Sequence, residues 1–327
     1  MLDTIKIAHT IPSMPLHDEL IRRAWQEKFD EYTGKPNGWF YKEKNGSKFP
    51  YLHLFTAPDG ITYFSVRISL PAFIFDSNVC LPNQIQVEKG LCNLSEYVSG
   101  KIDCDFDAKK AVVWEVHFTK DYYVGEYLMR LVLSNLAEMN IPRFKRGGYA
   151  ETTLYFHSKG KGKEENKPRT ICIYDKHSDC LNKSFSKDDI QKAEGMMRLE
   201  FRYKNPDAVK RLVKGLKLQN NEALTILTQD VSDFVLAPIQ NQILLLLEET
   251  DAPERIIKLT TAYGKRRSAT LIQFLVNQLL FGRDFYRIKS LGISRSAYYD
   301  CQKACREIGV LYLFDTAKTQ IQVGDVP

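Results

Sequence analysis

The sequence lacks the features of secreted and membrane proteins. Its first residues, MLDTIKIAH, do not combine a basic stretch with an apolar run, so we expect no signal peptide. The most apolar stretches, residues 241–247 and 270–281, fall well short of the ~18 residues expected of a membrane span. These absences predict a soluble cytoplasmic protein without a membrane partner.

Cysteine is present but forms no pattern. The seven cysteines are scattered and odd in number, and none is spaced as a pair of zinc ligands. This disfavours a disulfide scaffold and a zinc finger, and we expect reduced thiols. The sequence also has no internal repeat of fixed period and no long low-complexity tract.

Charge and length set wide limits. The net charge of +6 is a moderate basic excess, which suits an acidic polymer as partner but is equally common among enzymes of small ligands. At roughly 100–200 residues per domain, a chain of 327 residues predicts two or three domains.

Apolar spacing divides the chain into a strand-rich front half and a helical back half. Residues 4–12 predict an opening strand, residues 17–34 a helix, and residues 51–71 two strands around a Pro-Asp-Gly turn. From about Asp207 onward the apolar residues follow helical spacing. We predict an α+β fold, with an antiparallel sheet that has helices packed on one face and a mostly helical C-terminal domain after it. The expected boundaries are 1–105 for an N-terminal strand-rich part, 106–206 for the core sheet, and 207–327 for the helical domain.

Four predicted strands between residues 111 and 204 share one alternation. Successive strand side chains point to opposite faces, so alternate residues can be sorted. The apolar face of the first strand is expected to hold Val112, Trp114, Val116 and Phe118, and a helix over residues 127–139 is expected to cover it. The other face is expected to collect Glu115, His117, Glu151, Thr153, Tyr155, His157, Cys172, Tyr174, Lys176, Arg198, Glu200, Arg202 and Lys204.

A polar sheet face is often just a solvated face with cross-strand ion pairs. Here the content of the face favours chemistry. Carboxylates with a histidine suit a hard cation, lysine and arginine suit a phosphate, and a tyrosine supplies an oxygen nucleophile. Together these groups are typical of phosphoryl transfer.

At these strands the sequence resembles the gene II replication initiators of filamentous phages. It is also similar to the related plasmid proteins that initiate rolling-circle replication. The segments that carry the resemblance are VWEVHF, ETTLYF, RTICIYDKH and MMRLEFRYK, in the order and spacing of the family. Further blocks are MLDTIKI, VRISLPAFIFDSNVCLPN and DFYRIKSLGISRSAYYDCQKACREIGV, so the resemblance covers most of the chain in scattered pieces.

The resemblance implies a site-specific endonuclease and strand-transferase that works in a bacterial host cell. A tyrosine attacks one strand of the replication origin and stays linked to the 5′ phosphate. The family's strand motif places this nucleophile at Tyr174, with Lys176 beside it. The fourth-strand pattern from Arg198 to Arg202 is intact, but the arginine that usually precedes the first acid is absent before Glu115. The implied partners are origin DNA in double- and single-stranded form, a host helicase and a single-strand-binding protein.

Several roles follow from the chemistry of the residues. A tyrosine hydroxyl has a pKa of about 10 and needs activation before it attacks a phosphodiester. A divalent cation, Mg²⁺ or Mn²⁺, held by Glu115 and Glu200 would polarise the phosphate. His117 and Glu151 compete for the role of third ligand or base, and the sequence does not rank them.

The cationic residues of the same face are expected to contact DNA. Lys176 is predicted to lower the pKa of Tyr174 or to hold a phosphate oxygen, and Arg198 and Arg202 to bind neighbouring phosphates. Two other tyrosines come into question as a second nucleophile. Tyr155 is on the polar face but lacks an adjacent lysine, and Tyr203 is expected in the core.

Origin recognition is predicted elsewhere in the chain. Residues 291–310 have the outline of a helix-turn-helix with Arg295 early in its second helix, although a plain helical hairpin fits as well. The basic loop of residues 159–169 is predicted to contact phosphates through Lys159 and Lys161, or to be simply solvated.

Two alternative functions stay open at this point. One is a non-catalytic nucleic-acid-binding protein or regulator that uses the sheet as a stacking platform. The outward positions of the four strands are mostly charged, which counts against that hypothesis. The other is a metal-dependent phosphodiesterase without a covalent step, which differs only in whether Tyr174 is needed.

Overall fold

A computed structural model gives the structure of the chain. The described residues of Met1–Tyr123 and Arg143–Ala237 form one compact unit, and those of Val124–Pro142 and Pro238–Gly324 form a second. The structure describes residues 2–11, 17–29, 36–43, 48–57, 60–102, 105–124, 126–137, 139, 141–150, 152–159, 167–183, 185–248, 252–281 and 294–307.

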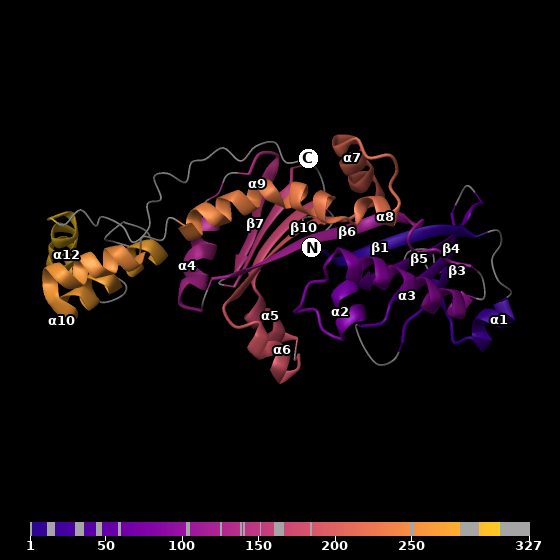
Figure 1. Cartoon of the computed structure of the whole chain (residues 1–327), viewed down its shortest axis with the longest axis horizontal. Coiled ribbons are helices and arrows are strands. Elements are labelled where there is room, and N and C mark those ends of the chain that lie inside the picture. The colour runs from indigo at the N-terminus through magenta and orange to yellow at the C-terminus, as the bar shows by residue number, and fades with distance from the viewer. Residues whose placement is uncertain are drawn as a thin grey trace. The chain divides into compact units, whose positions relative to one another are not determined.

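The first unit is built on one antiparallel sheet, shown in Figure 1. Within the described ranges the sheet has ten strands, in the order β2-β3-β4-β5-β1-β6-β10-β9-β8-β7. The strands are β1 (Leu2–Ile11), β2 (Gln26–Phe29), β3 (Pro36–Tyr41), β4 (Tyr51–Thr56), β5 (Thr62–Ser69), β6 (Val112–Tyr123), β7 (Phe144–Ala150), β8 (Thr153–Ser158), β9 (Arg169–Asp175) and β10 (Met196–Tyr203). The predicted α+β class with an antiparallel sheet is therefore confirmed.

The strands at the centre of the sheet come from two of the expected regions, residues 1–105 and residues 106–206. β1 pairs with β5 on one side and with β6 on the other, so no break in the sheet falls near residue 105. The compact units are divided differently, because the strand-rich part and the four later strands share one unit.

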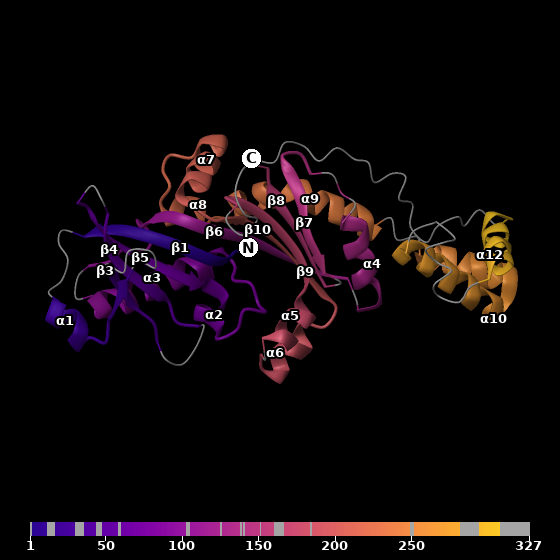
Figure 2. The same cartoon turned by 180° about the vertical axis from the view of Figure 1, so that it is seen from behind.

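Helices flank the sheet in the first unit, and Figure 2 shows them from behind. The expected helix over residues 17–34 is short. It ends at Arg22, Ala24 adopts a left-handed φ of 61°, and Gln26–Phe29 forms a strand instead. The helices that begin in this unit are α1 (His17–Arg22), α2 (Leu70–Phe75), α3 (Gln84–Ile102), α5 (Lys176–Asn182), α6 (Lys187–Lys192), α7 (Pro206–Leu216), α8 (Ala223–Ile226) and α9 (Gln229–Glu248).

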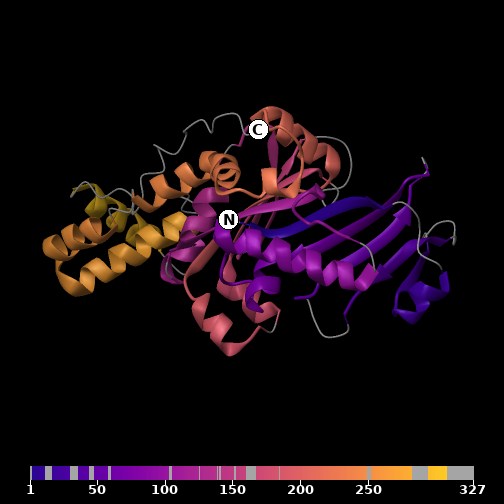
Figure 3. The same ribbon diagram turned by 45° about the vertical axis from the view of Figure 1, so that its right-hand side comes forward.

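Helix α3 covers the apolar face of the N-terminal strands, as Figure 3 shows. Lys101 of α3 donates a hydrogen bond to the Tyr41 hydroxyl of β3 at 2.9 Å. Beyond the helix, Phe106 meets Phe64 of β5 edge-on, with 5.5 Å between ring centroids. On the later strands the apolar face continues through contacts such as the Phe118–Tyr203 ring pair, and α7 packs beside β6.

A β-bulge in β6 changes which residues face the core. Two consecutive residues of β1 pair with Glu115 and Val113, so Trp114 is an extra residue in β6. The Trp114 ring turns to the face of Glu115, where it contacts Tyr63. The prediction that Val112 and Trp114 point to the core is therefore wrong, and Val113 is buried there instead.

The second unit is helical among its described residues. It contains α4 (Glu126–Ala137), the part of α9 from Pro238 onward, α10 (Ala252–Phe281) and α12 (Arg295–Glu307). Tyr263 of α10 donates to the Ala304 carbonyl of α12 at 2.9 Å. Because α4 belongs to this unit, its predicted role as a cover of the sheet stays a prediction.

The expected helix-turn-helix is described only in part. Its second helix is α12, with Arg295 as the first residue, whereas residues 282–293 lie outside the described part of the chain. Among the described helices, none has both the length and the apolar character needed to cross a membrane.

Candidate active site

A cavity of about 410 Å³ lies on the polar face of the sheet in the first unit. Strands β1, β5, β6, β8, β9 and β10 supply most of its wall, and α5 with the residue after it and the segment after α2 supply the rest. Its lining residues are Asp3, Thr4, Ser69, Asn78, His117, Thr153, Tyr155, Cys172, Tyr174, Asp179, Lys183, Glu200 and Arg202. The polar face predicted from alternation thus forms a hollow site with polar walls.

Tyr174 and Glu200 form a hydrogen-bonded pair in this cavity. β9 and β10 place Cys172 opposite Glu200, so Tyr174 lies diagonally across from that carboxylate. The Tyr174 hydroxyl donates a hydrogen bond to Glu200 Oε1 at 2.6 Å. Tyr174 is 7% exposed and Glu200 is 2% exposed, so this bond is nearly shielded from solvent. A nucleophile and a base at hydrogen-bond distance are the arrangement that nucleophilic catalysis requires.

The surroundings fix the proton on the tyrosine. Burial would raise the pKa of Glu200, but Arg202, His117 and the Tyr174 hydroxyl together lower it to about 2. Burial and the negative charge of Glu200 raise the pKa of Tyr174 well above its ordinary value of 10. The pair therefore consists of a neutral phenol and a carboxylate when no substrate is bound, and attack needs added positive charge at the phosphate or the phenol.

Arg202 is the cation closest to the pair. Its Nε donates to Glu200 Oε2 at 2.7 Å, and its Nη2 approaches the same oxygen at 2.5 Å. Its side chain is 23% exposed and lines the cavity, so part of the guanidinium faces the space that a phosphate would enter. The predicted phosphate contact of Arg202 is compatible with this position.

Lys176 lies beside Tyr174 but is not on the strand. β9 ends at Asp175, whose side chain accepts from the His177 amide as the N-cap of α5, and Lys176 is the first residue of that helix. The Lys176 ammonium is fully buried, 5.8 Å from the centre of the Tyr174 ring, and donates to Asn78 and Asp179. These contacts support a structural role for Lys176, in which it holds α5 against Asn78, more directly than a contact with a phosphate.

Glu115 and His117 form a second polar group on the same face. His117 Nε2 and Glu115 Oε1 are hydrogen bonded at 2.9 Å, and Arg67 binds both oxygens of Glu115 at 3.0 and 3.1 Å. Burial would raise the pKa of Glu115, but the hydrogen bonds from His117 and Arg67 lower it to about 2. His117 lines the cavity, whereas Glu115 is outside its lining.

The predicted metal ligands do not fit a preformed site as they stand. Each carboxylate oxygen of Glu115 and Glu200 already accepts a hydrogen bond, from Arg67, His117, Tyr174 or Arg202. Within the described part of the chain, no group of three or more histidine, cysteine, aspartate or glutamate side chains converges. Glu151, the fourth predicted ligand, lies outside the described residues. Binding of Mg²⁺ or Mn²⁺ stays a prediction from the sequence.

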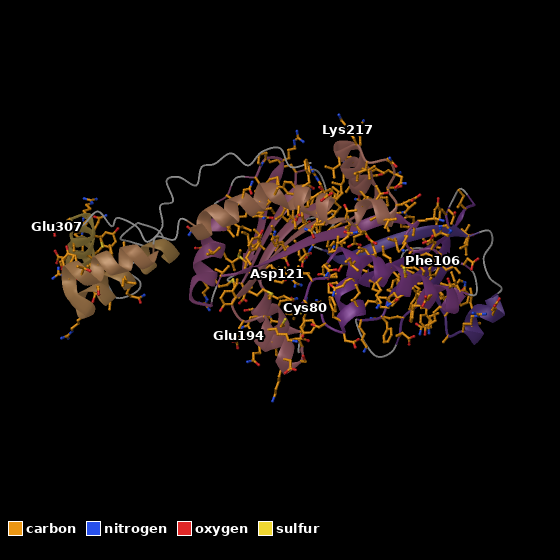
Figure 4. All side chains as sticks on the ribbon, viewed as in Figure 1. Cys80, Phe106, Asp121, Glu194, Lys217 and Glu307 are labelled. Atoms are coloured by element: carbon orange, nitrogen blue, oxygen red, sulfur yellow. The ribbon has the colours of Figure 1, made fainter. Side chains whose placement is uncertain are left out.

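Arg198 is a structural residue rather than a surface cation. It is fully buried and binds both oxygens of Asp121, which is labelled in Figure 4, at 2.7 and 2.9 Å. Its remaining contacts are the carbonyls of Asn78 at 2.6 Å and Val79 at 2.9 Å. These bonds tie β10 to the segment after α2, so the structure argues against the predicted phosphate contact of Arg198.

The other predicted residues lie apart from the cavity or outside the described chain. Lys159 is exposed at the end of β8, and Lys161 is not described. Arg295 is exposed on α12, where its guanidinium lies 6.0 Å from the Tyr299 ring centre. Tyr203 is buried in the core, as predicted.

Tyr155 shares the cavity with Tyr174. It lies opposite Cys172 across β8 and β9 and stacks on His157 at 5.9 Å between centroids. Cys172 and burial raise the pKa of Tyr155 to about 12. Among the residues that the structure describes, no carboxylate accepts a hydrogen bond from Tyr155 as Glu200 does from Tyr174, and the ranking of the two tyrosines stays a prediction.

Sequence reasoning missed several residues of this site. Asp3, Asn78, Asp179 and Lys183 line the cavity from outside the four strands. The Lys183 ammonium pairs with Asp179 at 2.7 Å, and the lysine side chain is 59% exposed. No local pattern marks these residues, because only tertiary packing brings them to the cavity. Arg67, on β5, could have been found as an outward cation beside β1, had that pairing been known.

Comparison with known proteins gives little direct guidance. No family model matches the chain, and no curated protein matches it. A similar solved structure is that of the rolling circle replication initiator protein from Geobacillus stearothermophilus, with a TM-score of 0.31 and 10% identity. It covers 67% of this chain and 79% of the other. The finer resemblance to the gene II type stays a prediction.

Proposed function

We propose that this chain is a rolling-circle replication initiator that cuts and rejoins one DNA strand through Tyr174. The observation that carries the proposal is the 2.6 Å hydrogen bond from the Tyr174 hydroxyl to Glu200 inside a polar cavity. Arg202 and Lys183 add positive charge to the same cavity. A buried oxygen nucleophile, a base in contact with it and cations at hand are the groups that phosphodiester transesterification needs.

The proposed step exchanges the bond between phosphorus and the 3′ oxygen for a bond between phosphorus and the Tyr174 oxygen. The Tyr174 oxygen attacks phosphorus while its proton passes to Glu200 Oε1, and the bond between phosphorus and the 3′ oxygen breaks. The product is a 5′-phosphotyrosyl ester and a free 3′ hydroxyl, whose proton comes from solvent or from the protonated Glu200. A later 3′ hydroxyl reverses the step and seals the strand, because the ester retains the energy of the cut bond.

Arg202 has a specific part in this step. It binds Glu200 Oε2, so it keeps the carboxylate charged and directed while Oε1 is free to receive the proton. An incoming phosphate would compete for the same guanidinium, since arginine binds phosphate and carboxylate with similar geometry. A shift of Arg202 toward the phosphate would weaken its hold on Glu200 and raise the basicity of that carboxylate when it is needed.

The test is formation of a covalent adduct. Wild-type protein and Tyr174→Phe are incubated with labelled supercoiled or single-stranded origin DNA, and the adduct is detected on a denaturing gel. We expect the adduct with wild type and none with Tyr174→Phe. Tyr155→Phe is the matched control, because it removes a hydroxyl from the same cavity, and it should retain the adduct.

Other outcomes separate the alternatives. If the DNA is cut but no adduct forms, and the cutting persists in Tyr174→Phe, a phosphodiesterase without a covalent step would be favoured. Binding of DNA with no cutting by wild type would favour the non-catalytic regulator. Parallel reactions with Mg²⁺, with Mn²⁺ and with EDTA test the predicted divalent cation separately from the role of the tyrosine.

A further inference from the structure

An aromatic surface lies on the same sheet face as the cavity, over the N-terminal strands. The pairing registers place its members together: Phe40 is opposite His53, and Phe55 is opposite Tyr63. The bulge in β6 turns Trp114 to this face as well. We call the following residues the aromatic surface: Phe40, Tyr51, His53, Phe55, Tyr63 and Trp114.

The rings of the aromatic surface contact one another in two groups, one of two rings and one of four. Phe40 stacks on Tyr51 with 5.9 Å between centroids, and His53 stacks on Phe55 at 4.9 Å. Phe55 and Tyr63 stack at 5.7 Å. The Trp114 ring then meets Phe55 at 6.0 Å and Tyr63 at 5.6 Å. The two groups together extend over β3, β4, β5 and β6.

These rings are half-buried rather than enclosed, so each keeps part of its surface open. Cations accompany them. The Lys6 ammonium lies 5.3 Å from the centre of the Trp114 ring, and the neighbouring Arg67 side chain is 50% exposed. Lys28 is close enough to both Lys6 and His53 to influence their pKa values. An open aromatic face bordered by cations complements an anionic polymer with flat bases.

His53 contributes a neutral ring to the aromatic surface. Burial, Lys28 and Lys6 lower the pKa of His53 to about 4, so the ring is neutral at physiological pH. Its Nε2 atom is buried without a hydrogen-bond partner in the described structure. The imidazole therefore serves as a flat neutral ring that stacks on Phe55 rather than as a charged group.

The aromatic surface is continuous with the candidate active site. β6 carries Trp114 on one side of Glu115 and His117 on the other. A chain of hydrogen bonds runs from Arg67 through Glu115 to His117, which lines the cavity. A strand of DNA leaving the cavity across neighbouring strands of the sheet, which are ~4.8 Å apart, would pass onto these rings.

We propose that the aromatic surface binds single-stranded DNA by base stacking and presents the adjoining phosphates to the cavity. The proposal rests on the proposed function, which supplies the cutting site. Bases stack on aromatic rings with little regard to sequence, so this surface would hold the strand, while recognition of the origin comes from elsewhere. Cross-strand aromatic pairs also stabilise sheets, and the test must separate that effect from binding.

The test measures binding of a labelled oligothymidine of about 20 nucleotides, longer than the ~4–16 nucleotides that single-strand-binding modules cover. We expect Trp114→Ala and Phe55→Ala each to weaken binding by about 5- to 150-fold, as loss of a stacked base does. Trp114→Phe should restore most of the affinity, since it keeps a flat ring. Quenching of tryptophan fluorescence by the oligonucleotide should be strong in wild type and largely lost in Trp114→Phe.

Phe234→Ala is the matched control, because Phe234 is 56% exposed on α9 and lies outside the aromatic surface. It should bind as wild type does. Circular dichroism and urea unfolding show whether each variant folds. Lys6→Ala, which removes no ring, provides a variant less prone to unfold, and it should reduce the dependence of affinity on salt.

The outcomes distinguish this proposal from the proposed function. Adduct formation by wild type together with wild-type affinity in folded Trp114→Ala and Phe55→Ala would overturn the stacking surface and leave Tyr174 chemistry intact. Affinity that depends on Trp114 in a protein that forms no adduct would support the stacking surface and overturn the nickase. Wild-type protein that does not bind the oligonucleotide would overturn the stacking proposal.

Discussion

The polar face of the sheet contains two regions of different chemistry. Around the cavity, buried charges are paired inside the protein, as Glu200 is with Tyr174 and Arg202. Over the N-terminal strands, half-buried rings meet one another, and part of each ring is open to solvent. The difference follows from burial. A charge taken out of water needs a partner within the protein, whereas a neutral ring does not.

The largest expected difference between the regions is catalytic. Glu200→Gln should slow adduct formation by at least about 100-fold, because a general base contributes roughly 10²–10⁴-fold. Glu115→Gln should have a smaller effect, since Glu115 is outside the cavity lining. The rate of adduct formation at saturating DNA measures both, and binding of duplex DNA should be retained. Equal losses in the two variants would instead support the metal site predicted from the sequence.

The next effect is on stability, and it tests the buried charges of the cavity region. Arg198→Ala should destabilise the protein by about 3–5 kcal/mol, because it leaves Asp121 without its buried partner. Urea unfolding followed by circular dichroism measures this change. A variant of unchanged stability that binds DNA weakly would restore the phosphate contact predicted from the sequence.

The two regions should also differ in their response to acid. The pKa of Glu200 is lowered from 4.5 to about 2 on folding, so its contribution to stability is full above about pH 4.5 and is lost as pH falls toward 2. The pKa of His53 is lowered from 6.5 to about 4, so protons bind first to the unfolded chain, and stability is lost between these values.

His53→Phe separates these two pH ranges. It keeps a ring beside Phe55 and should reduce the loss of stability between about pH 6.5 and 4, while leaving the steeper loss at lower pH. Urea midpoints from neutral to acid pH measure both ranges. A variant that follows the wild-type curve throughout would show that His53 does not titrate in the upper range.

The smallest expected effect lies at the border between the regions. Arg67 pairs with Glu115, but half of its side chain is exposed, and exposed ion pairs contribute only ~0–1 kcal/mol. Arg67→Ala should therefore change stability by less than about 1 kcal/mol, by urea unfolding. A change as large as that of Arg198→Ala would place Arg67 among the buried structural charges.

Much of the polar face could be predicted from alternation alone. Glu200, Tyr174 and Arg202 are regular strand residues, and the period of two placed them together. Trp114 could not be placed this way. A bulge is set by the register of the partner strand β1, and the residues of β6 do not reveal it.

Helix α3 is not among the elements predicted above, although the sequence carries a signal for it. Helix α3 had a readable signal, because Val87, Leu91, Leu94 and Val98 recur at helical spacing and are fully buried. Asn83 and Gln86 also form a reciprocal cap, with hydrogen bonds of 3.0 and 2.9 Å.

The residues that complete the cavity had no readable signal. Asn78 lies in the segment after α2 and Lys183 just beyond α5, and each reaches the site because of long-range contacts. One such contact is the bond from buried Lys176 to Asn78, which connects the start of α5 to that segment. Such long-range contacts leave no periodic pattern in the sequence from which they could be predicted.

The extra residue at Trp114 has a consequence for redesign. Residues before it in β6 and residues after it follow separate alternations, so either stretch can be rewritten without inverting the other. Exchange of the strands upstream for those of another antiparallel sheet should leave His117 and the later residues of β6 aimed as they are now. At Trp114 the aromatic surface could therefore be replaced while the residues that line the cavity keep their positions.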